Sequence, residues 1–182
     1  MLTGFATGPK TTPIIPSSPK SAGASEATMI VRDRSDRDAA WITALLRSRW
    51  GGTVVTAHNE MIDTAQLPAL VAGDQLGLAT YRVQGHEAEL VTLDAVAPGQ
   101  RVGTHLLDAL VERLRGQGVH RLWVTTTNDN LAALAFYQKR GFHLRHLRPG
   151  AVDEARHIKP SIPTVAGNGI PIRDEIELCR NL

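Results

Sequence analysis

The sequence predicts one mixed α/β domain in which helices flank a central, mostly antiparallel sheet. Its 182 residues are 42% hydrophobic, which is enough for a single domain with a full core. Two alternating segments, 76–83 and 87–96, are separated by a short turn, as in a β-hairpin. After them, patterns of helical and of strand period follow one another to the end of the chain. Together these observations predict a mixed α/β domain.

The first 28 residues differ in composition from the rest. Ser, Thr, Gly and Ala predominate there, apolar periodicity is weak, and four prolines recur, Pro9, Pro13, Pro16 and Pro19. We interpret 1–28 as a flexible N-terminal tail and 29–182 as the folded domain.

The first half of the domain begins with a predicted strand at 29–34. Ser35 and Asp38 have the spacing of a capping box, and the helix that they open carries an apolar stripe and ends at Gly51-Gly52. Two or three further strands are predicted, at 67–72, 76–83 and 87–96, with a hairpin turn at 84–86.

The second half begins with a long amphipathic helix at 101–115, which Gly116 and Gly118 terminate. A strand at 121–127, a helix within 128–142 and strands at 142–147 and 172–178 complete the pattern. The connection 151–170 is long for a compact domain, so we expect it to be either ordered over a site or mobile.

Composition excludes several classes of protein. The net charge of +2 and the pI near 9.0 do not indicate a nucleic-acid partner. No apolar run approaches the roughly 18 residues of a membrane span, and no secretory signal is visible. The single cysteine, Cys179, and the lack of zinc spacing fit a reducing compartment, so we expect a cytoplasmic protein without a metal.

The stretch "VAPGQRVGTHLL", residues 96–107, leads from a strand through a Pro-Gly turn into a helix. The first amides of such a helix, from Arg101 to Thr104, favour an anion, and Gly103 lets a phosphate approach the backbone. The alternative is an ordinary strand-to-helix turn. The spacing matches neither a Walker loop nor a dinucleotide fingerprint.

A second stretch, "NDNLAALAFYQKRGF" at 128–142, carries a tyrosine one turn before the helix stops at Gly141. Together the two stretches resemble the acyl-CoA-binding motifs of the GCN5-related N-acetyltransferase (GNAT) superfamily, over residues 29–182. Six positions match the second motif, Asn130, Ala133, Phe136, Tyr137, Gly141 and Phe142. The first motif departs from the family, because Arg101 stands where a glycine is usual and the loop from Val96 to Gly103 is short.

The resemblance implies an acyltransferase fold with acetyl-CoA as co-substrate, held where the strands 87–96 and 121–127 splay apart. The residues that it implicates in binding are Leu93 and Ala95 at the acetyl carbonyl, Val96, Gln100, Arg101, Val102, Gly103 and Thr104 at the pyrophosphate, and Asn130 at the pantetheine amides. Asn130 has an alternative role as a helix N-cap.

The resemblance further implies direct transfer of an acetyl group to a primary amine of a small molecule or peptide. Tyr137 would protonate the departing thiolate, because a phenol pKa near 10 lies close to a thiol pKa of about 8.5. Its alternative is a core tyrosine. For the general base we consider Glu89, Asp94 and His58, each of which is otherwise an ordinary polar residue.

We expect Trp50 and residues 151–170 to wall the acceptor side, the latter as a lid. A homodimer that pairs through the last strand is compatible with its amphipathic pattern. Two other classes of function stay open, a non-catalytic acyl-CoA-binding or regulatory module on the same fold and a scaffold domain that binds no cofactor. Binding of acetyl-CoA, with or without turnover, separates the three.

Overall fold

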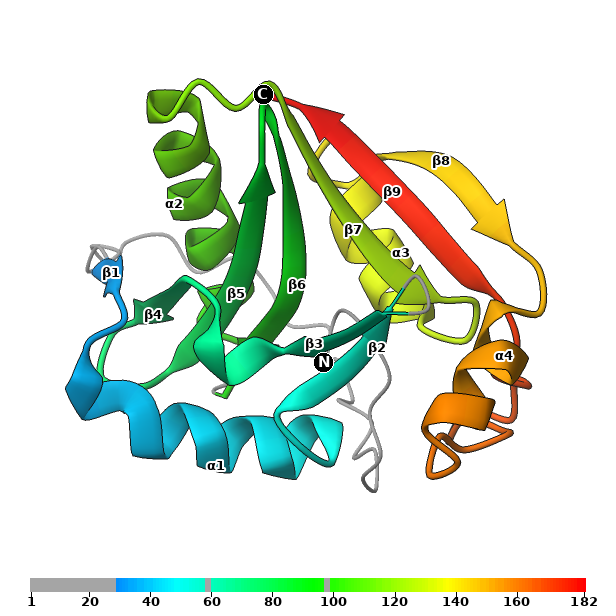
Figure 1. Ribbon diagram of the computed structural model, residues 1–182. Coiled ribbons are helices and arrows are strands. Elements are labelled where there is room, and N and C mark those ends of the chain that lie inside the picture. Colours follow the sequence, from blue (N-terminus) through cyan, green and yellow to red (C-terminus); the bar gives the residue numbers. More distant parts are fainter. Residues whose placement is uncertain (1–28, 58–59, 97–98) are drawn as a thin grey trace.

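A computed structural model describes residues 29–57, 60–96 and 99–182. The predicted tail 1–28 and the base candidate His58 therefore lie outside the described residues. The described chain forms a seven-stranded sheet in the order β1-β4-β5-β6-β7-β9-β8 and a separate hairpin, β2-β3 (Figure 1). Within that sheet only β6 and β7 pair in parallel, so the predicted mixed α/β fold with a mostly antiparallel sheet is confirmed.

The strands have the following bounds: β1 Val31–Asp33, β2 Val54–Ala57, β3 Glu60–Asp63, β4 Ala69–Ala72, β5 Gly77–Gln84, β6 Glu87–Ala95, β7 Arg121–Thr127, β8 His143–Arg148 and β9 Glu175–Asn181. The helices are α1 Ala39–Trp50, α2 Val102–Gly116, α3 Leu131–Gln138 and α4 Ala151–Ile158, with short 3-10 helices at Asp36–Asp38 and Thr64–Gln66. Among the described residues, none of these helices combines the length and apolar character needed to cross a bilayer.

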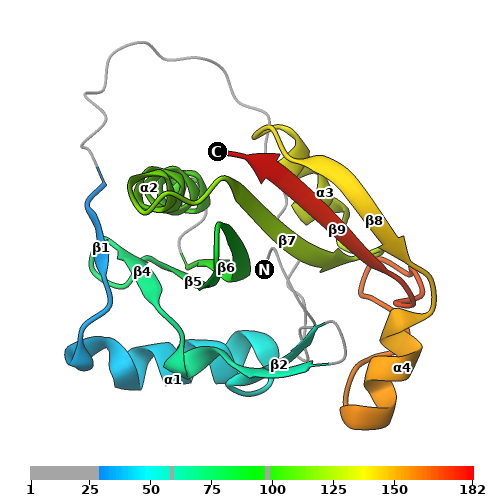
Figure 2. The ribbon, with the colours of Figure 1, turned by 45° about the horizontal axis from the view of Figure 1, so that its top comes forward.

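The helices cover both faces of the sheet. Residues of α1 pack with Val71, Leu78 and Val91 in one core cluster, whereas α2 and α3 pack with residues such as Leu90 and Leu93 in another. Figure 2 shows α1 and α2 on opposite sides of β4, β5 and β6. The hairpin β2-β3 lies on the α1 side, because Glu60 of β3 is bound there by Arg82 of β5. We call the two sides the α1 face and the α2/α3 face.

Strands β6 and β7 separate soon after they start. They pair at only three positions, which join Glu87 to Arg121, Ala88 to Leu122 and Glu89 to Trp123. Both strands continue beyond the last pair, to Ala95 and Thr127, and β7 pairs with β9 throughout. The sheet therefore splays between β6 and β7, as the family resemblance implies.

A β-bulge interrupts β6 just after Glu89. Opposite it on β5, Thr80 pairs with Thr92 but Tyr81 pairs with Leu90, so Val91 is the extra residue. Side chains along a regular strand alternate between the two faces of the sheet, and the extra residue of a bulge shifts this alternation by one position. As a result Glu89 and Asp94, an odd number of residues apart, both face the α1 side, where their partners Arg82 and Trp50 lie.

Several elements differ from the sequence prediction. The hairpin β2-β3 was not expected, because two four-residue strands of mixed polarity have no clear period. Residues 151–170 contain α4 and a small core of their own around Val152 and Ile162, and the last strand begins at Glu175 rather than at 172. The capping box at Ser35 and Asp38 is confirmed, although it opens a 3-10 turn that leads into α1.

Candidate active site

The first turn of α2 lies directly against β5. Arg101, the N-cap residue, has φ 53° and ψ 22°, a left-handed conformation that glycine adopts more readily than arginine. Gly77 makes the close approach possible, since a Cβ there would lie 2.4 Å from Cγ1 of Val102 and 2.8 Å from the carbonyl oxygen of Asp94. Arg101 thus adopts a conformation that glycine favours, at a position where the family motif usually has a glycine.

A second arginine, Arg140, reaches the same helix end from the turn that follows α3. Arg140 donates to the Thr104 hydroxyl at 2.5 Å and to the Phe136 carbonyl at 2.9 Å, and its guanidinium carbon lies 3.6 Å from the centre of the Phe136 ring. Burial, and then the charge of Arg101, lower the pKa of Arg140. Its Nε is buried and has no partner among the described residues. Two guanidinium groups and a helix N-terminus therefore form a region that favours an anion.

Tyr137 of α3 is completely buried. Its ring contacts those of Phe136 and Phe142, with centroids 5.2 and 5.3 Å away. The hydroxyl group has no hydrogen-bond partner within the described part of the chain. Burial raises the pKa of Tyr137 well above 10, and the nearby charge of Asp94 raises it further. A buried, unsatisfied hydroxyl is costly in a folded protein and points to a partner that binds later.

Asp94 lies near this hydroxyl, on the splayed part of β6. Trp50 donates its indole N–H to Oδ2 of Asp94 at 2.9 Å, while Oδ1 is buried without a partner among the residues described. Burial raises the pKa of Asp94 and the indole hydrogen bond opposes that shift. Trp50 itself is fully buried, so the expectation that it walls the acceptor side is wrong; it anchors Asp94 instead.

Glu89 lies at the point where β6 and β7 part. Its Oε2 accepts from Nε of Arg82 at 2.5 Å, and Arg82 also binds Glu60 at 2.9 Å. Burial raises the pKa of Glu89 to about 7 against the opposing effect of Arg82, and the charges of Glu60 and Glu177 add to the rise. The carboxyl group is therefore poised to exchange a proton near neutral pH.

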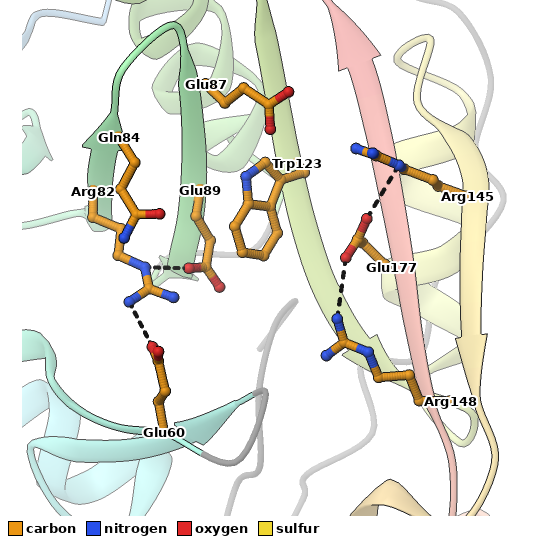
Figure 3. A pocket seen from close by; sticks show the side chains of 9 residues that line it. All are labelled: Glu60, Arg82, Gln84, Glu87, Glu89, Trp123, Arg145, Arg148 and Glu177. Atoms are coloured by element: carbon orange, nitrogen blue, oxygen red, sulfur yellow. Dashed lines mark hydrogen bonds and ion pairs between the residues drawn. The ribbon is translucent and has the colours of Figure 1, made fainter.

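A cavity of about 410 Å³ opens beside Glu89 on the α1 face (Figure 3). Six strands contribute its lining, which consists of Glu60, Arg82, Gln84, Glu87, Glu89, Trp123, Arg145, Arg148 and Glu177. No residue of 151–170 is in this lining, and the lid expected there is therefore not part of the cavity wall. Apart from Glu89, sequence analysis missed these residues.

The other predicted binding residues surround the splay. Leu93 and Ala95 lie on the part of β6 that no longer pairs with β7. The amide of Val96 already donates to the Leu76 carbonyl at 2.8 Å, and Gln100 is exposed. The side chain of Asn130 accepts from the Ala133 amide at 3.2 Å, so its role as the N-cap of α3 is confirmed.

The arrangement fits a bound acyl-CoA. The hydroxyl of Tyr137, Oδ1 of Asp94 and Nε of Arg140 are buried and have no hydrogen-bond partner among the described residues, and the basic end of α2 carries Arg101 close enough to Arg140 to lower its pKa. Within the described residues, by contrast, no three His, Cys, Asp or Glu side chains are grouped as metal ligands.

Comparisons with known proteins agree with this geometry. An uncharacterized Bacillus subtilis protein, YdhI, is 35% identical over 152 residues, which cover 81% of this chain and 95% of YdhI. A Pseudomonas aeruginosa L-methionine sulfoximine/L-methionine sulfone acetyltransferase is 26% identical over 65% of this chain and 83% of its own. A GNAT acetyltransferase from Elizabethkingia anophelis, solved with acetyl-CoA bound, shares the fold with a TM-score of 0.57 and 16% identity, covering 86% of this chain and 99% of the other.

The family model for the acetyltransferase (GNAT) family matches residues 35–142, which include α1, the splayed strands, the first turn of α2 and Tyr137. Acetyl-CoA is the co-substrate of this family. The chain belongs to the acetyltransferase (GNAT) family, and it is an enzyme of the acetyltransferase class.

Proposed function

We propose that the protein transfers an acetyl group directly from acetyl-CoA to an amine, with Glu89 as the general base and Tyr137 as the general acid. One observation carries the proposal: the two groups lie on opposite faces of the sheet at the splay, Glu89 on the α1 face and Tyr137 on the α2/α3 face. A thioester held between them would meet the amine on one side and lose its sulfur on the other.

Glu89 suits the task of base. An amine reaches neutral pH largely as an ammonium ion and must lose a proton before it attacks. A carboxyl group with a pKa of about 7 is partly ionised there and is a stronger base than an ordinary glutamate. Of the other candidates, Asp94 is already held by Trp50 and His58 lies outside the described residues.

Tyr137 suits the task of acid because its proton is retained until it is needed. Burial raises the pKa of the phenol, and by the same physical effect burial would raise the pKa of a thiol at the splay. The two values therefore move in the same direction, and proton transfer from the hydroxyl to the leaving sulfur stays accessible. The hydroxyl also gains the partner that it lacks.

The basic end of α2 would hold the pyrophosphate. The amides of the first turn from Arg101 to Thr104 and the charges of Arg101 and Arg140 supply the binding groups. A non-catalytic module on this fold was considered because Arg101 replaces a glycine. Since its backbone adopts a left-handed conformation, that replacement does not argue against catalysis.

The test is a calorimetric titration of the full chain with acetyl-CoA, followed by a thiol-release assay with a panel of amines. We expect micromolar binding and release that depends on the amine. Glu89→Gln and Tyr137→Phe should each reduce turnover by about 10²- to 10⁴-fold. Binding without amine-dependent release would favour the binding module, and an absence of binding would refute the proposal.

A further inference from the structure

The charges that line the cavity fall into two groups that face each other (Figure 3). We call Glu60, Arg82, Glu87 and Glu89, from β3, β5 and β6, the acidic wall. Arg145, Arg148 and Glu177, from β8 and β9, form the basic wall. The charge of Glu177 contributes to the raised pKa of Glu89, so the walls lie within electrostatic reach of one another.

The acidic wall keeps an excess of carboxylates. Arg82 donates hydrogen bonds to two of them, from Nε to Glu89 and from Nη1 to Glu60. The third, Glu87, accepts from Arg121 at 2.6 Å, and Arg121 is not part of the cavity lining. Even with Arg121 included, three carboxyl groups face two guanidinium groups. A cation is therefore favoured on this side.

Among the lining residues, the basic wall has the opposite excess, with two guanidinium groups and one carboxylate. Nε of Arg145 lies 3.6 Å from Glu177, and Nη2 of Arg148 lies 3.5 Å from the same carboxylate, distances beyond those of a strong hydrogen bond. Each guanidinium has five N–H donors. Arg148 also lies 3.5 Å from Glu175, which is outside the lining; with Glu175 counted, this wall is neutral while the acidic wall stays negative. This wall is therefore less negative than the acidic wall, and its weakly paired guanidinium N–H groups can bind an anionic group.

We propose that the acceptor is a small zwitterion, with its amine at the acidic wall beside Glu89 and an anionic group, such as a carboxylate, at Arg145 and Arg148. The inference rests on the proposed function, because it names the acceptor class of that site. Trp123 lies between the walls and offers a ring face to the carbon chain that joins the two groups. A volume of about 410 Å³ suits a small molecule.

The sheet also sets the separation of the two charges. The strand that carries Glu177, β9, is two positions from β6 in the sheet order, and neighbouring strands lie about 4.8 Å apart. Arg145 and Arg148 are on β8, one position further, and β6 and β7 splay apart beyond Glu89, so the walls are separated by at least about 10 Å at the level of the backbone. An α-carboxylate, one carbon from its amine, is too close to meet both walls, so the anionic group is expected several bonds away.

The experiment compares kcat/KM for matched pairs of acceptors. Each pair has the same amine chain and ends either in a carboxylate or in the corresponding carboxamide: glycine and glycinamide, 4-aminobutanoate and 4-aminobutanamide, 6-aminohexanoate and 6-aminohexanamide. We expect the carboxylate to be preferred by tenfold or more in the longer pairs and by less in the glycine pair. Calorimetry of the carboxylates in the presence of CoA gives a second readout.

Variants assign the preference to the basic wall. Arg145→Gln, whose arginine forms an ion pair with Glu177 in the described part of the chain, should abolish the preference while kcat/KM for the carboxamides stays within about twofold; Arg148→Gln should do the same. Arg145→Lys should keep part of the carboxylate preference, because lysine retains the positive charge but lacks the planar guanidinium group. The matched control is Arg115→Gln, because Arg115 is an exposed arginine of α2 that pairs with Glu112, outside the cavity lining.

The outcomes are distinguishable from a failure of the proposed function. Transfer to carboxamides with no carboxylate preference, or a preference that survives both glutamine variants, overturns the inference and leaves the transferase intact. The inference is also overturned, with the transferase left intact, if acetyl-CoA binds but none of the carboxylate acceptors is either acetylated or bound. An absence of acetyl-CoA binding and of transfer to any amine would instead refute the proposed function itself.

Discussion

The Nε atom of Arg82 lies 2.5 Å from Oε2 of Glu89, and yet the pKa of Glu89 is about 7 rather than 4.5. A guanidinium at that distance normally favours the ionised carboxylate. Burial outweighs it here, with help from the negative charges of Glu60 and Glu177. Arg82 therefore limits the rise in the pKa of Glu89 and keeps it close to neutral pH.

This balance predicts the pH dependence of catalysis. If Glu89 acts as base, the pH profile of kcat/KM should have a rising limb centred at about pH 7, where the carboxyl group loses its proton. This limb lies well below the one that deprotonation of an aliphatic amine would give near pH 10. Arg82→Met removes the effect that lowers the pKa of Glu89, so the limb should move to higher pH. Arg121→Met, which removes a guanidinium from Glu87 instead, should leave it in place. A limb that does not respond to Arg82→Met would contradict the assignment.

The same group predicts how stability depends on pH. Native Glu89 keeps its proton up to about pH 7, whereas the unfolded chain releases it near 4.5, so folding takes up a proton between these values. The contribution of Glu89 to the free energy of unfolding is therefore present at low pH and falls as pH rises from 4.5 to 7. The shift corresponds to about 3 kcal/mol. Urea denaturation at pH 5 and pH 8 gives the decrease in the free energy of unfolding over this range, and the decrease should be smaller in Glu89→Gln than in the unaltered protein by about this amount. An equal decrease in both proteins would contradict the prediction.

The two tyrosines of the chain predict effects of opposite sign. Tyr137→Phe should lower kcat while the dissociation constant for acetyl-CoA changes little, and it should raise the free energy of unfolding by about 1 kcal/mol, since it deletes a buried unsatisfied hydroxyl. Tyr81→Phe removes a hydroxyl that interacts with Arg113, so stability should fall while kcat is kept. Thermal denaturation and steady-state kinetics measure both. Weaker acetyl-CoA binding with unchanged kcat in Tyr137→Phe would exclude the acid role.

Gly77 predicts a coupling between packing and cofactor affinity. In Gly77→Ala the new Cβ would overlap Val102 and the carbonyl of Asp94, so we expect a loss of about 1–3 kcal/mol in stability. The first turn of α2 must shift, and acetyl-CoA affinity should fall with it. Gly116→Ala at the other end of α2 meets no atom within 4 Å and should change neither quantity appreciably. Calorimetry and urea denaturation measure the two effects, and unchanged affinity in Gly77→Ala would contradict the proposed pyrophosphate site.

Sequence reasoning succeeded where the information was local. The turn at 84–86 predicted the β5-β6 hairpin, and that hairpin alone brings Arg82 opposite Glu89. The spacing from Asn130 to Phe142 predicted where α3 begins and that Tyr137 precedes its end. Such features depend on a few neighbouring residues, whose preferences the sequence states directly.

The cavity could not be predicted in this way. Its walls come from six strands, and β9 enters the sheet between β7 and β8 although it follows both in the chain. No local pattern therefore places Arg148 near Glu89. The basic residues likewise have contacts that no local pattern indicates, since Arg140 packs on Phe136 and Lys159 donates to the carbonyls of Trp50 and Val54. Burial of the long apolar stems of such side chains is a tertiary effect.

The extra residue in β6 determines which side of the sheet each carboxyl group can serve. Five positions separate Glu89 from Asp94, an odd number, and in a regular strand one of them would face α2 and α3. Val91 changes this parity. Deleting that one residue would leave four positions between the carboxylates in a regular strand and keep both on the α1 face, whereas a strand that kept Val91 without the bulge would turn one of them to the opposite surface of the sheet.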